Sequence, residues 1–399
     1  MRIVVQKFGG TSVATEESRS FVLAKVLKLK LDGLFPVIVV SAMGRKGENY
    51  ATDTLIHLLK DINEFVNLRE LDQIMCCGEI ISAAVMAATL QKAGLDAIML
   101  NASQAGIITD SQFSKARIQR IDTTRIFHLL NHGKIPVICG FQGVNDFNDF
   151  TTLGRGGSDT TAAALGVSLQ AERIEIFTDV EGIMTADPRL VENTKILDKV
   201  SYDEVCQLAY QGAKVIHPRA VEIAMQKHIP MLIKSTFSDA EGTLIGDFIQ
   251  KDIDDRIVTG IAHITGLSQI KVHNISQQQQ TKLFHLLGDS GISIDLINIY
   301  PDYIVFTIES VLTVQFFTAL SDYPLNIEIT DKCAKVSIVG GGMREASGVI
   351  GDFVQVLADH QIEILQTVDS HTSISALIAE ANLKAAMTVL HRQFILTDS

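Results

Sequence analysis

The sequence has 399 residues, of which 47% are hydrophobic, and its 34 Lys and Arg against 46 Asp and Glu give a formal net charge of −12. This length predicts two or three domains with a sizeable buried core. The acidic balance argues against a nucleic-acid partner, because nucleic-acid surfaces need clustered basic residues. Five cysteines without C-x-x-C spacing, no signal-peptide pattern and no apolar run of membrane-span length predict a reduced, cytoplasmic protein with no membrane partner.

The first 235 residues alternate short β-rich runs with helical patterns such as residues 51–66 and 159–171. This alternation predicts an α/β domain with a mostly parallel central sheet and helices on both faces. In such a fold, ligands bind at the carboxyl ends of the strands, and the polar motifs of this sequence follow the predicted strands. The predicted strands are residues 3–5, PVIVVSAMG (36–44), LDAIMLN (95–101), IPVICGFQG (135–143), RIEIFTDV (173–180) and IPMLIKST (229–236).

The sequence becomes more polar from about residue 236, and residues 235–255 predict the exit from the first domain. Two stretches with the same order of elements follow, one from about residue 266 and the other from about residue 333. Each predicts a strand, a helix, two strands and a further helix. This order, which follows the β-α-β-β-α-β pattern through its second helix and occurs twice, predicts a tandem of small α+β modules.

The stretch KFGGTSV, residues 7–13, follows the first predicted strand and precedes a helix rich in Leu, Val and Lys. Glycines let the backbone approach an anion, and a helix N-terminus offers unpaired N–H groups with a positive dipole end. Lys7 would then neutralise a phosphate oxygen. The alternative for this stretch alone is a glycine turn with a helix N-cap. It is not a P-loop, because G-x-x-x-x-G-K-[ST] occurs nowhere in the sequence.

A second glycine-rich stretch, TTLGRGGSDTTAAALG at residues 151–166, also leads into a predicted helix. It carries Arg155, whose planar guanidinium suits a carboxylate. The stretch lacks the third glycine of the dinucleotide fingerprint. The glycine-rich residues 339–348 lack it as well. A Rossmann dehydrogenase is therefore disfavoured.

Two further stretches carry polar groups after predicted strands or between helices. Residues 177–189 contain the polar residues Thr178, Asp179, Asp187 and Arg189. These side chains are candidates for a ligand site, and the alternative is an ordinary loop after a strand. Lys214 follows Gly212 and Ala213, and a lone lysine is usually solvated surface. His217 precedes Pro218, which favours a capping or packing role over a catalytic one.

Seven motifs, in this order along the chain, resemble those of the aspartokinases. The resemblance covers nearly the whole sequence, because the tandem C-terminal modules look like the paired ACT domains of that family. Within the family, residues 41–55 and 367–374 are most similar to the monofunctional diaminopimelate-sensitive isozymes of Gram-positive bacteria. The seven motifs are residues 7–12, 41–44, 77–79, 154–159, 178–182, 187–189 and 212–214.

The resemblance implies an amino-acid-kinase (carbamate-kinase-like) catalytic domain followed by two ferredoxin-like ACT modules. The family's chain path also implies that residues 256–264 pair with the second module, so that the two modules are interleaved. The implied divisions are residues 1–240 for the catalytic domain, 241–262 for a linker and strand, 263–330 for the first ACT module and 331–399 for the second.

The implied activity is the transfer of the γ-phosphoryl group of ATP to the side-chain carboxylate of L-aspartate, which gives 4-phospho-L-aspartate, the first step of lysine, diaminopimelate, threonine and methionine biosynthesis. A carboxylate with a reference pKa of about 3.9 is already ionised at neutral pH, so the reaction needs no general base. Positioning and charge neutralisation remain as the tasks of the protein.

The roles of individual residues follow from the family motifs. Catalysis is assigned to Lys7, Asp159 and Lys214, with Asp159 orienting Lys7. ATP binding is assigned to Lys7, Phe8, Gly9, Gly10, Ser12, Thr178, Asp179, Gly182, Met184, Asp187 and Arg189. Met184 stands where several members have a tyrosine beside the adenine. Aspartate binding is assigned to Ser41, Thr52, Glu79, Arg155 and Ser158, with Arg155 for the α-carboxylate and Glu79 for the α-ammonium.

The resemblance also implies ligands and partners. Mg²⁺ is expected to arrive as Mg-ATP, bound through phosphate oxygens and not by a carboxylate site of the protein. Feedback by an amino acid, with meso-diaminopimelate first and lysine second, is expected near Gln277, Ser293, Ile294 and Asp295. ACT modules commonly associate edge to edge, which implies a homodimer or a larger homo-oligomer.

Three other functions stay open at this stage. Glutamate 5-kinase and acetylglutamate kinase share the glycine-rich phosphate sites, but they lack the ACT pair and the full set of motifs. The third is a catalytically silent ACT amino-acid sensor, against which the retained Lys7, Arg155, Asp159 and Lys214 argue.

Overall fold

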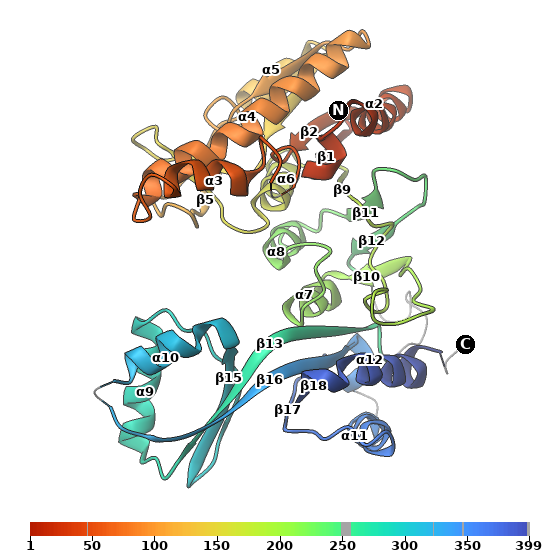
Figure 1. The fold of residues 1–399 in the computed structure, drawn as a ribbon. Coiled ribbons are helices and arrows are strands. Elements are labelled where there is room, and N and C mark those ends of the chain that lie inside the picture. Colours follow the sequence, from red (N-terminus) through yellow and green to blue (C-terminus); the bar gives the residue numbers. More distant parts are fainter. Residues whose placement is uncertain (46, 249–256, 322, 345–346, 397–399) are drawn as a thin grey trace. The chain divides into compact units, whose positions relative to one another are not determined.

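A computed structural model describes residues 1–45, 47–248, 257–321, 323–344 and 347–396 (Figure 1). The chain divides into two compact units. The first comprises residues 1–183, 196–206 and 214–249, and the second comprises residues 184–195, 207–213 and 250–399.

The first unit is built on an eight-stranded sheet with the strand order β10-β12-β11-β9-β1-β2-β6-β3. All pairs from β11 to β3 are parallel, and β12 alone runs antiparallel to its neighbour β11. The predicted mostly parallel sheet is therefore confirmed. The strands are β1 (Ile3–Phe8), β2 (Phe35–Val40), β3 (Ala97–Leu100), β6 (Ile135–Cys139), β9 (Arg173–Thr178), β10 (Lys199–Ser201), β11 (Met231–Ser235) and β12 (Thr243–Gly246).

Helices pack on both faces of this sheet, because neighbouring residues of a strand point to opposite sides. On one face, Phe8 belongs to a core that α2 and α4 complete with Val22, Val26 and Met86. On the other face, Lys7 contacts α6 through Asp159. The helices are α1 (Gly10–Val13), α2 (Glu16–Leu31), α3 (Thr52–Lys60), α4 (Leu68–Lys92), α5 (Thr124–Asn131), α6 (Gly157–Ser168), α7 (Tyr202–Tyr210), which contributes to both units, and α8 (Pro218–Met225).

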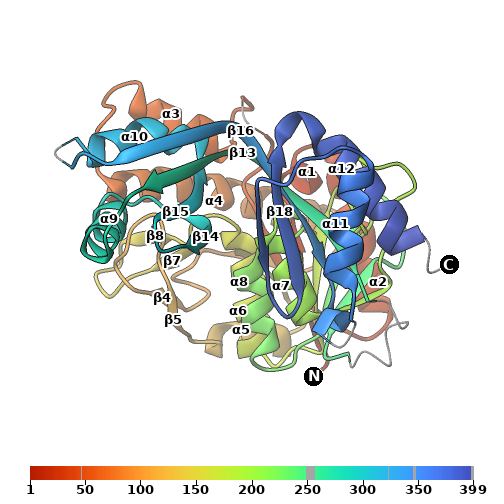
Figure 2. The same cartoon turned by 90° about the horizontal axis from the view of Figure 1, so that it is seen from below.

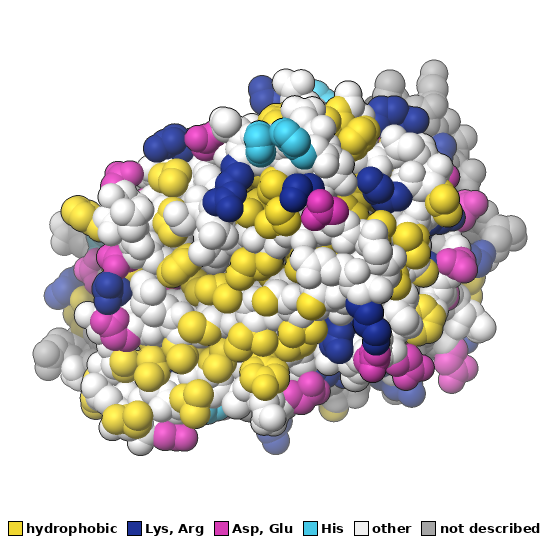
Figure 3. Space-filling view, turned by 90° about the horizontal axis from the view of Figure 1, so that it is seen from above, with side chains coloured by type: hydrophobic (Ala, Val, Ile, Leu, Met, Phe, Trp, Pro, Cys, Tyr) yellow, Lys and Arg dark blue, Asp and Glu magenta, His cyan; other side chains and the backbone are white. Residues whose placement is uncertain are grey.

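Helix α4 is long and apolar enough, by length and composition alone, to cross a membrane, and it is the one such helix among the described residues. This differs from the expectation that no apolar run reaches that length. Half of its most apolar window is buried inside the first unit, where Ala83, Met86 and Leu90 pack toward the sheet. Figure 3, which views the molecule from the side of α4 and α5, shows hydrophobic side chains gathered over part of that face.

A second, four-stranded sheet with the order β5-β4-β7-β8 was not predicted from the sequence. Residues 135–143 were expected to form one strand. Instead the chain turns at Phe141, whose φ is +68°, so that β6 and β7 belong to different sheets. The strands of this smaller sheet are β4 (Ile107–Thr109), β5 (Ile118–Ile121), β7 (Gln142–Val144) and β8 (Phe150–Thr152).

The second unit contains one antiparallel six-stranded sheet with the order β14-β15-β13-β16-β18-β17. Its two longest strands, β13 and β16, pair with each other along most of their length. Residues Gly260–Ile264 of β13 pair with Lys335–Val339, and residues Gln269–His273 pair with Asn326–Thr330. Each long strand therefore joins both halves of the sheet. The strands are β13 (Gly260–His273), β14 (Asp295–Ile299), β15 (Tyr303–Glu309), β16 (Asn326–Val339), β17 (Gln366–Asp369) and β18 (Ser373–Ala379).

Two separate apolar cores form on this sheet. Phe306 and Phe316 lie in the core of the half that carries α9 and α10, whereas Phe353 and Met387 lie in the core of the half that carries α11 and α12. Figures 1 and 2 show these two helix pairs beside different ends of the sheet. The helices are α9 (Gln277–Asp289), α10 (Thr313–Ala319), α11 (Val349–Asp359) and α12 (Leu383–His391).

Candidate active site

The last residues of β1 and the turn after it bring Lys7 and the two glycines to the carboxyl edge of the central sheet. A Cβ atom on Gly10 would lie 2.5 Å from the Ala42 carbonyl oxygen, so only glycine allows this approach of the two loops. Lys7 Nζ lies 2.7 Å from Asp159 Oδ1, and both side chains are only 13% exposed. The predicted contact between Asp159 and Lys7 is present in the structure.

The second glycine-rich stretch forms the turn between β8 and α6. Gly154 and Gly156 have φ values of +75° and +70°, a region that favours glycine. A Cβ on Gly156 would lie 2.3 Å from His217 Cβ. The turn ends where α6 begins at Gly157, and it places Arg155, Ser158 and Asp159 around one cavity.

His217 itself is the N-cap of α8, and its Nδ1 accepts a hydrogen bond of 3.3 Å from the backbone N–H of Arg219. Burial lowers the pKa of His217, which favours the neutral ring that this acceptor role requires. The predicted capping role is confirmed.

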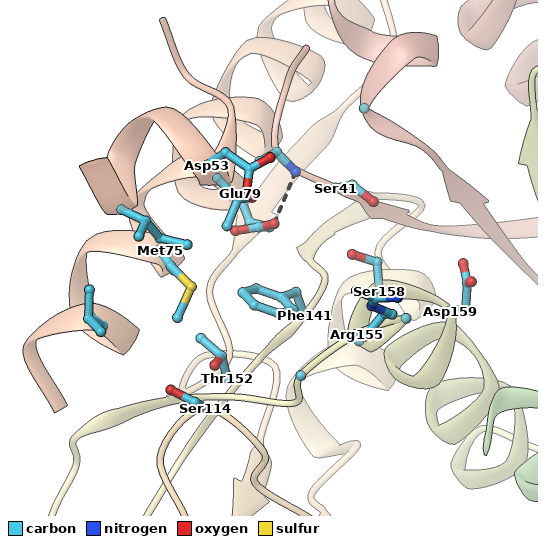
Figure 4. A pocket seen from close by; sticks show the side chains of 18 of the residues that line it. Ser41, Asp53, Met75, Glu79, Ser114, Phe141, Thr152, Arg155, Ser158 and Asp159 are labelled. Carbon is cyan, nitrogen blue, oxygen red and sulfur yellow. Dashed lines mark hydrogen bonds between the residues drawn. The ribbon is translucent and has the colours of Figure 1, made fainter. Parts of the chain in front are cut away.

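Glu79 is a buried acid on α4, with 2% of its surface exposed. Its Oε1 accepts a 3.1 Å hydrogen bond from the Ala42 backbone N–H (Figure 4). Its Oε2 is buried and has no hydrogen-bond partner among the residues that the structure describes. Burial raises the pKa of Glu79 to about 8, although the bond from Ala42 acts in the opposite direction. This carboxyl group can gain a strong interaction from a cationic ligand.

The turn after β1, the turn between β8 and α6, and helices α3 and α4 line a cavity of about 660 Å³ in the first unit. It is large enough for a small polar ligand, and its charged lining includes both signs. In the view of Figure 4, Glu79 lies on one side of Phe141 and Arg155 on the other. Of the predicted site residues, the cavity is lined by Lys7, Gly10, Ser41, Thr52, Glu79, Arg155, Ser158 and Asp159.

The cavity also has lining residues for which no role was predicted. Asp53 and Thr152 lie in the stretches 41–55 and 151–166 noted above, and the others lie outside the motifs. These residues include Asp53, Lys60, Met75, Ser114, Phe141 and Thr152.

Other predicted residues of the first unit lie outside the cavity lining. Phe8 stacks on Phe177 with ring centroids 4.7 Å apart, and the hydroxyl of Ser12 lies 2.7 Å from that of Thr236 in a buried pair. Asp179 forms an exposed 3.0 Å ion pair with Arg45. The remaining residues of this group are Gly9, Thr178, Gly182 and Lys214, of which Lys214 is exposed.

Three predicted nucleotide-site residues belong to the second unit. Asp187 and Arg189 form an ion pair of 2.6 Å, and the hydrogen bonds from Arg189 lower the pKa of Asp187. The Met184 sulfur accepts a 3.6 Å contact from the Thr194 hydroxyl.

The predicted effector residues also belong to the second unit. Gln277 and Ser293 are exposed, at the start of α9 and before β14. Ile294 packs at the edge of an apolar core. Asp295 begins β14 and forms an ion pair with Lys335, a residue of which only 3% is exposed.

Comparison with known families gives two matches. Residues 2–235 match the amino acid kinase family, and residues 328–392 match an ACT domain family. The first match alone covers more than half of the chain.

Several known proteins are similar over their whole length. Aspartokinase 1 of Bacillus subtilis is 45% identical over 403 residues, which cover 100% of both chains. The aspartokinase of Geobacillus stearothermophilus is 39% identical over 408 residues, which cover 100% of this chain and 98% of that protein.

Solved structures show the same fold. Escherichia coli aspartokinase III in complex with aspartate and ADP matches with a TM-score of 0.82 at 24% identity, over 99% of this chain and 100% of that chain. The aspartate kinase of Synechocystis matches with a TM-score of 0.56 at 32% identity, over 98% of this chain and 69% of that chain.

Proposed function

The chain belongs to the aspartokinase family, and from this premise we propose which of its residues bind the substrates of an aspartate kinase. The enzyme transfers the γ-phosphoryl group of ATP to the side-chain carboxylate of L-aspartate. An oxygen–phosphorus bond forms at that carboxylate, and the bond between the γ-phosphorus and the bridging oxygen of ADP breaks. No proton has to be removed from the ionised nucleophile, so the protein contributes positioning and charge.

The single observation that best supports an aspartate site is the buried Oε2 of Glu79, which has no partner within the described part of the chain, in a cavity that Arg155 also lines. An α-ammonium group would supply the missing partner of Glu79. The guanidinium of Arg155 would bind the α-carboxylate with two parallel hydrogen bonds. Ser41, Thr52 and Ser158, which also line the cavity, would contact the reacting carboxylate.

The phosphates are assigned to Lys7 and the backbone of Gly9 and Gly10. Asp159 holds Lys7 in place through the 2.7 Å ion pair, and that pair limits the freedom of the ammonium group before ATP binds. The further nucleotide contacts of Phe8, Ser12, Thr178, Asp179, Gly182, Met184, Asp187 and Arg189, and the charge contribution of Lys214, rest on the motif resemblance.

Mg²⁺ supplies charge neutralisation on the β- and γ-phosphates when Mg-ATP is bound. Asp159, a carboxylate of the cavity lining, is already paired with Lys7, which is assigned to the phosphates. This pairing supports Mg²⁺ binding through phosphate oxygens, with no carboxylate cage of the protein.

The second unit is proposed to bind a feedback amino acid, meso-diaminopimelate before lysine, near Gln277, Ser293, Ile294 and Asp295. The ACT match and the overall similarity to aspartokinases support this role. We further propose that the enzyme is cytoplasmic, that it assembles as a homodimer or larger homo-oligomer through its ACT modules, and that its functional divisions are residues 1–240, 241–262, 263–330 and 331–399.

An ATP-dependent hydroxamate assay with L-aspartate tests the proposal, repeated with glutamate and N-acetylglutamate as acceptors and with diaminopimelate, lysine or threonine added. We expect product with aspartate alone and inhibition by diaminopimelate. Product with glutamate or N-acetylglutamate instead would contradict the aspartate site. Amino-acid binding without any product would indicate a sensor.

An Arg155→Lys variant sharpens the assay, because lysine keeps the charge but loses the two-point geometry. We expect the KM for aspartate to rise by about 10- to 100-fold with little change in the KM for ATP. Arg2→Lys is a matched control, since Arg2 forms an exposed pair with Glu172 and lies outside the cavity.

A further inference from the structure

A second carboxylate of α4, Asp72, is completely buried behind the wall of the cavity. It accepts hydrogen bonds from the backbone N–H groups of Ser114 and Thr152, the shortest at 2.8 Å and 2.7 Å. The hydroxyl groups of the same two residues also donate to it, at 3.1 Å and 2.9 Å. No basic side chain pairs with Asp72 in the described parts of the chain, so its hydrogen-bond partners are these donors of Ser114 and Thr152.

Asp72 also fixes the backbone next to the glycine-rich turn. Ser114 has a φ of +67°, which costs a non-glycine residue free energy unless other contacts hold it. The Ser114 carbonyl oxygen would lie 3.1 Å from a Cβ atom on Gly154. The bonds to Asp72 therefore hold Ser114 and the end of β8 in place, one residue before the turn that carries Arg155.

The direction of the hydroxyl groups has a chemical consequence. A hydroxyl carries one hydrogen and two acceptor lone pairs. The hydroxyls of Ser114 and Thr152 both donate their hydrogen to Asp72. Toward any other group, these hydroxyl oxygens can therefore act only as hydrogen-bond acceptors. Both residues line the cavity, and Figure 4 shows them next to each other on the side away from Arg155. This wall is therefore suited to a donor group and unsuited to a carboxylate.

We propose that Asp72 is a positioning residue that orients the hydroxyls of Ser114 and Thr152 so that this wall accepts the α-ammonium of L-aspartate. Glu79 supplies the charge of that subsite, and Ser114 and Thr152 supply two further acceptors. The inference rests on the proposed function, and it adds the element that distinguishes aspartate from a dicarboxylate without an amino group.

The first test compares aspartate with succinate, which has both carboxylates but no ammonium. In initial-rate assays with Mg-ATP, Thr152→Val should raise the KM for aspartate by about 10-fold, since a hydrogen bond to a charged group is lost. The Ki of succinate as a competitor of aspartate should stay unchanged. Thr152→Ser keeps the hydroxyl and should retain the KM of the parent enzyme.

The second test changes Asp72 itself. In Asp72→Asn, the new amide N–H group is a donor and cannot accept hydrogen bonds from the hydroxyls of Ser114 and Thr152. At least one of these hydroxyls therefore has to direct its hydrogen elsewhere. We expect the preference for aspartate over succinate to fall by about 10- to 100-fold. Asp149→Asn makes the same change of charge in the pair with Arg69 just before β8, outside the cavity, and should leave that preference intact.

Parallel weakening of aspartate and succinate in Thr152→Val and Asp72→Asn would overturn the inference, because a purely structural role affects both ligands alike. Unchanged KM values for aspartate would overturn it as well. Thermal unfolding of each variant identifies those that fail to fold, and Ser114→Ala then provides an independent variant of the same wall. If the parent enzyme makes no product with aspartate, the proposed function fails and not this inference alone.

Discussion

Glu79 in the first unit and Lys335 in the second are both charged residues whose surface is almost entirely buried, with 2% and 3% exposed. Glu79 accepts one hydrogen bond from the backbone, and its other oxygen meets no partner among the described residues. Lys335 meets the carboxylate of Asp295. Removing a charge from water costs free energy unless a partner compensates for it. In the second unit Asp295 provides that compensation for Lys335, whereas in the first unit Glu79 has only the backbone hydrogen bond.

Glu79 is thus available to pair with a ligand, whereas Lys335 is already paired within the protein. Glu79 lines a cavity and has a raised pKa, as is common where function sets the environment of a titratable group. At the proposed effector residue Asp295, by contrast, an effector ammonium would compete with Lys335, which already pairs with this carboxylate. Aspartate would complete a site in the first unit, whereas an effector would rearrange one in the second.

The largest effect is expected for Lys7→Met, which removes the cation from the proposed phosphate site and leaves Asp159 without its ion-pair partner. We expect kcat to fall by about 10³-fold, in the range found for cations that stabilise phosphoryl transfer. The hydroxamate assay at saturating ATP and aspartate measures it. Lys92→Met is the control, because Lys92 is 82% exposed in its pair with Glu16, and a kcat for Lys7→Met close to the control would contradict the assignment.

Glu79→Gln should weaken aspartate binding yet stabilise the ligand-free protein at high pH. The KM for aspartate should rise by about 100-fold, because the partner of a buried charge is lost. In the parent enzyme the folded pKa of about 8 lies above the unfolded value of 4.5. Protonation of Glu79 therefore stabilises the fold fully below pH 4.5, and this contribution is lost as the pH rises to 8.

The stability advantage of Glu79→Gln over the parent enzyme should consequently grow by about 3 kcal/mol between pH 5 and pH 8. Urea unfolding at the two pH values measures it. Glu70→Gln makes the same substitution on α4 at an exposed position paired with Arg69, and it should show no such growth. A pH-independent difference for Glu79→Gln would mean that the acid is ionised in the free protein.

Asp295→Ala should destabilise the second unit, because Lys335 keeps its burial and loses its partner. We expect a loss of about 2 to 3 kcal/mol in the free energy of unfolding, reduced by the 51% exposure of the Asp295 side chain. Lys335→Met should cost less, since it leaves a carboxylate that water can reach. Urea unfolding compares the two variants.

The same Asp295→Ala variant tests the effector site. Inhibition by diaminopimelate should be lost while the hydroxamate activity without effector is retained. Full inhibition of the variant would remove Asp295 from the proposed effector site, whatever its effect on stability.

The sequence was sufficient for the parts of the site that are local in the chain. Buried runs such as residues 36–40 predicted parallel strands, and the glycines around Lys7 and Arg155 marked the turns that follow them. The ion pair between Lys7 and Asp159 joins residues far apart in the chain, yet the family motifs supplied it. The family resemblance also carried the function, because a single glycine-rich turn is compatible with many anions.

The remaining features depend on contacts that no local pattern encodes. Asp72 meets Ser114 and Thr152 across 42 and 80 residues of chain, and it sits in a helix whose pattern shows only an interrupted apolar face. The strands of the small sheet have three or four residues, too few for a period-2 pattern to stand out. The two 14-residue strands of the second unit were each expected as shorter strands, and in the structure the pairing of β13 with β16 shifts register halfway, between Ile264 and Gln269.

The smallest effect is expected at an ion pair that water already reaches. Arg45 and Asp179 are 68% and 51% exposed, so Arg45→Ala should change the free energy of unfolding by less than about 0.5 kcal/mol. Asp179 is one of the proposed nucleotide residues, and releasing it from Arg45 should lower the KM for ATP by about twofold, since an exposed pair is a weak competitor. Initial rates at varied ATP measure this change. A rise in that KM would instead mean that Arg45 itself contacts the nucleotide. The partner of Arg45 would then be a ligand, as proposed for Glu79, and not a group of the protein, as for Lys335.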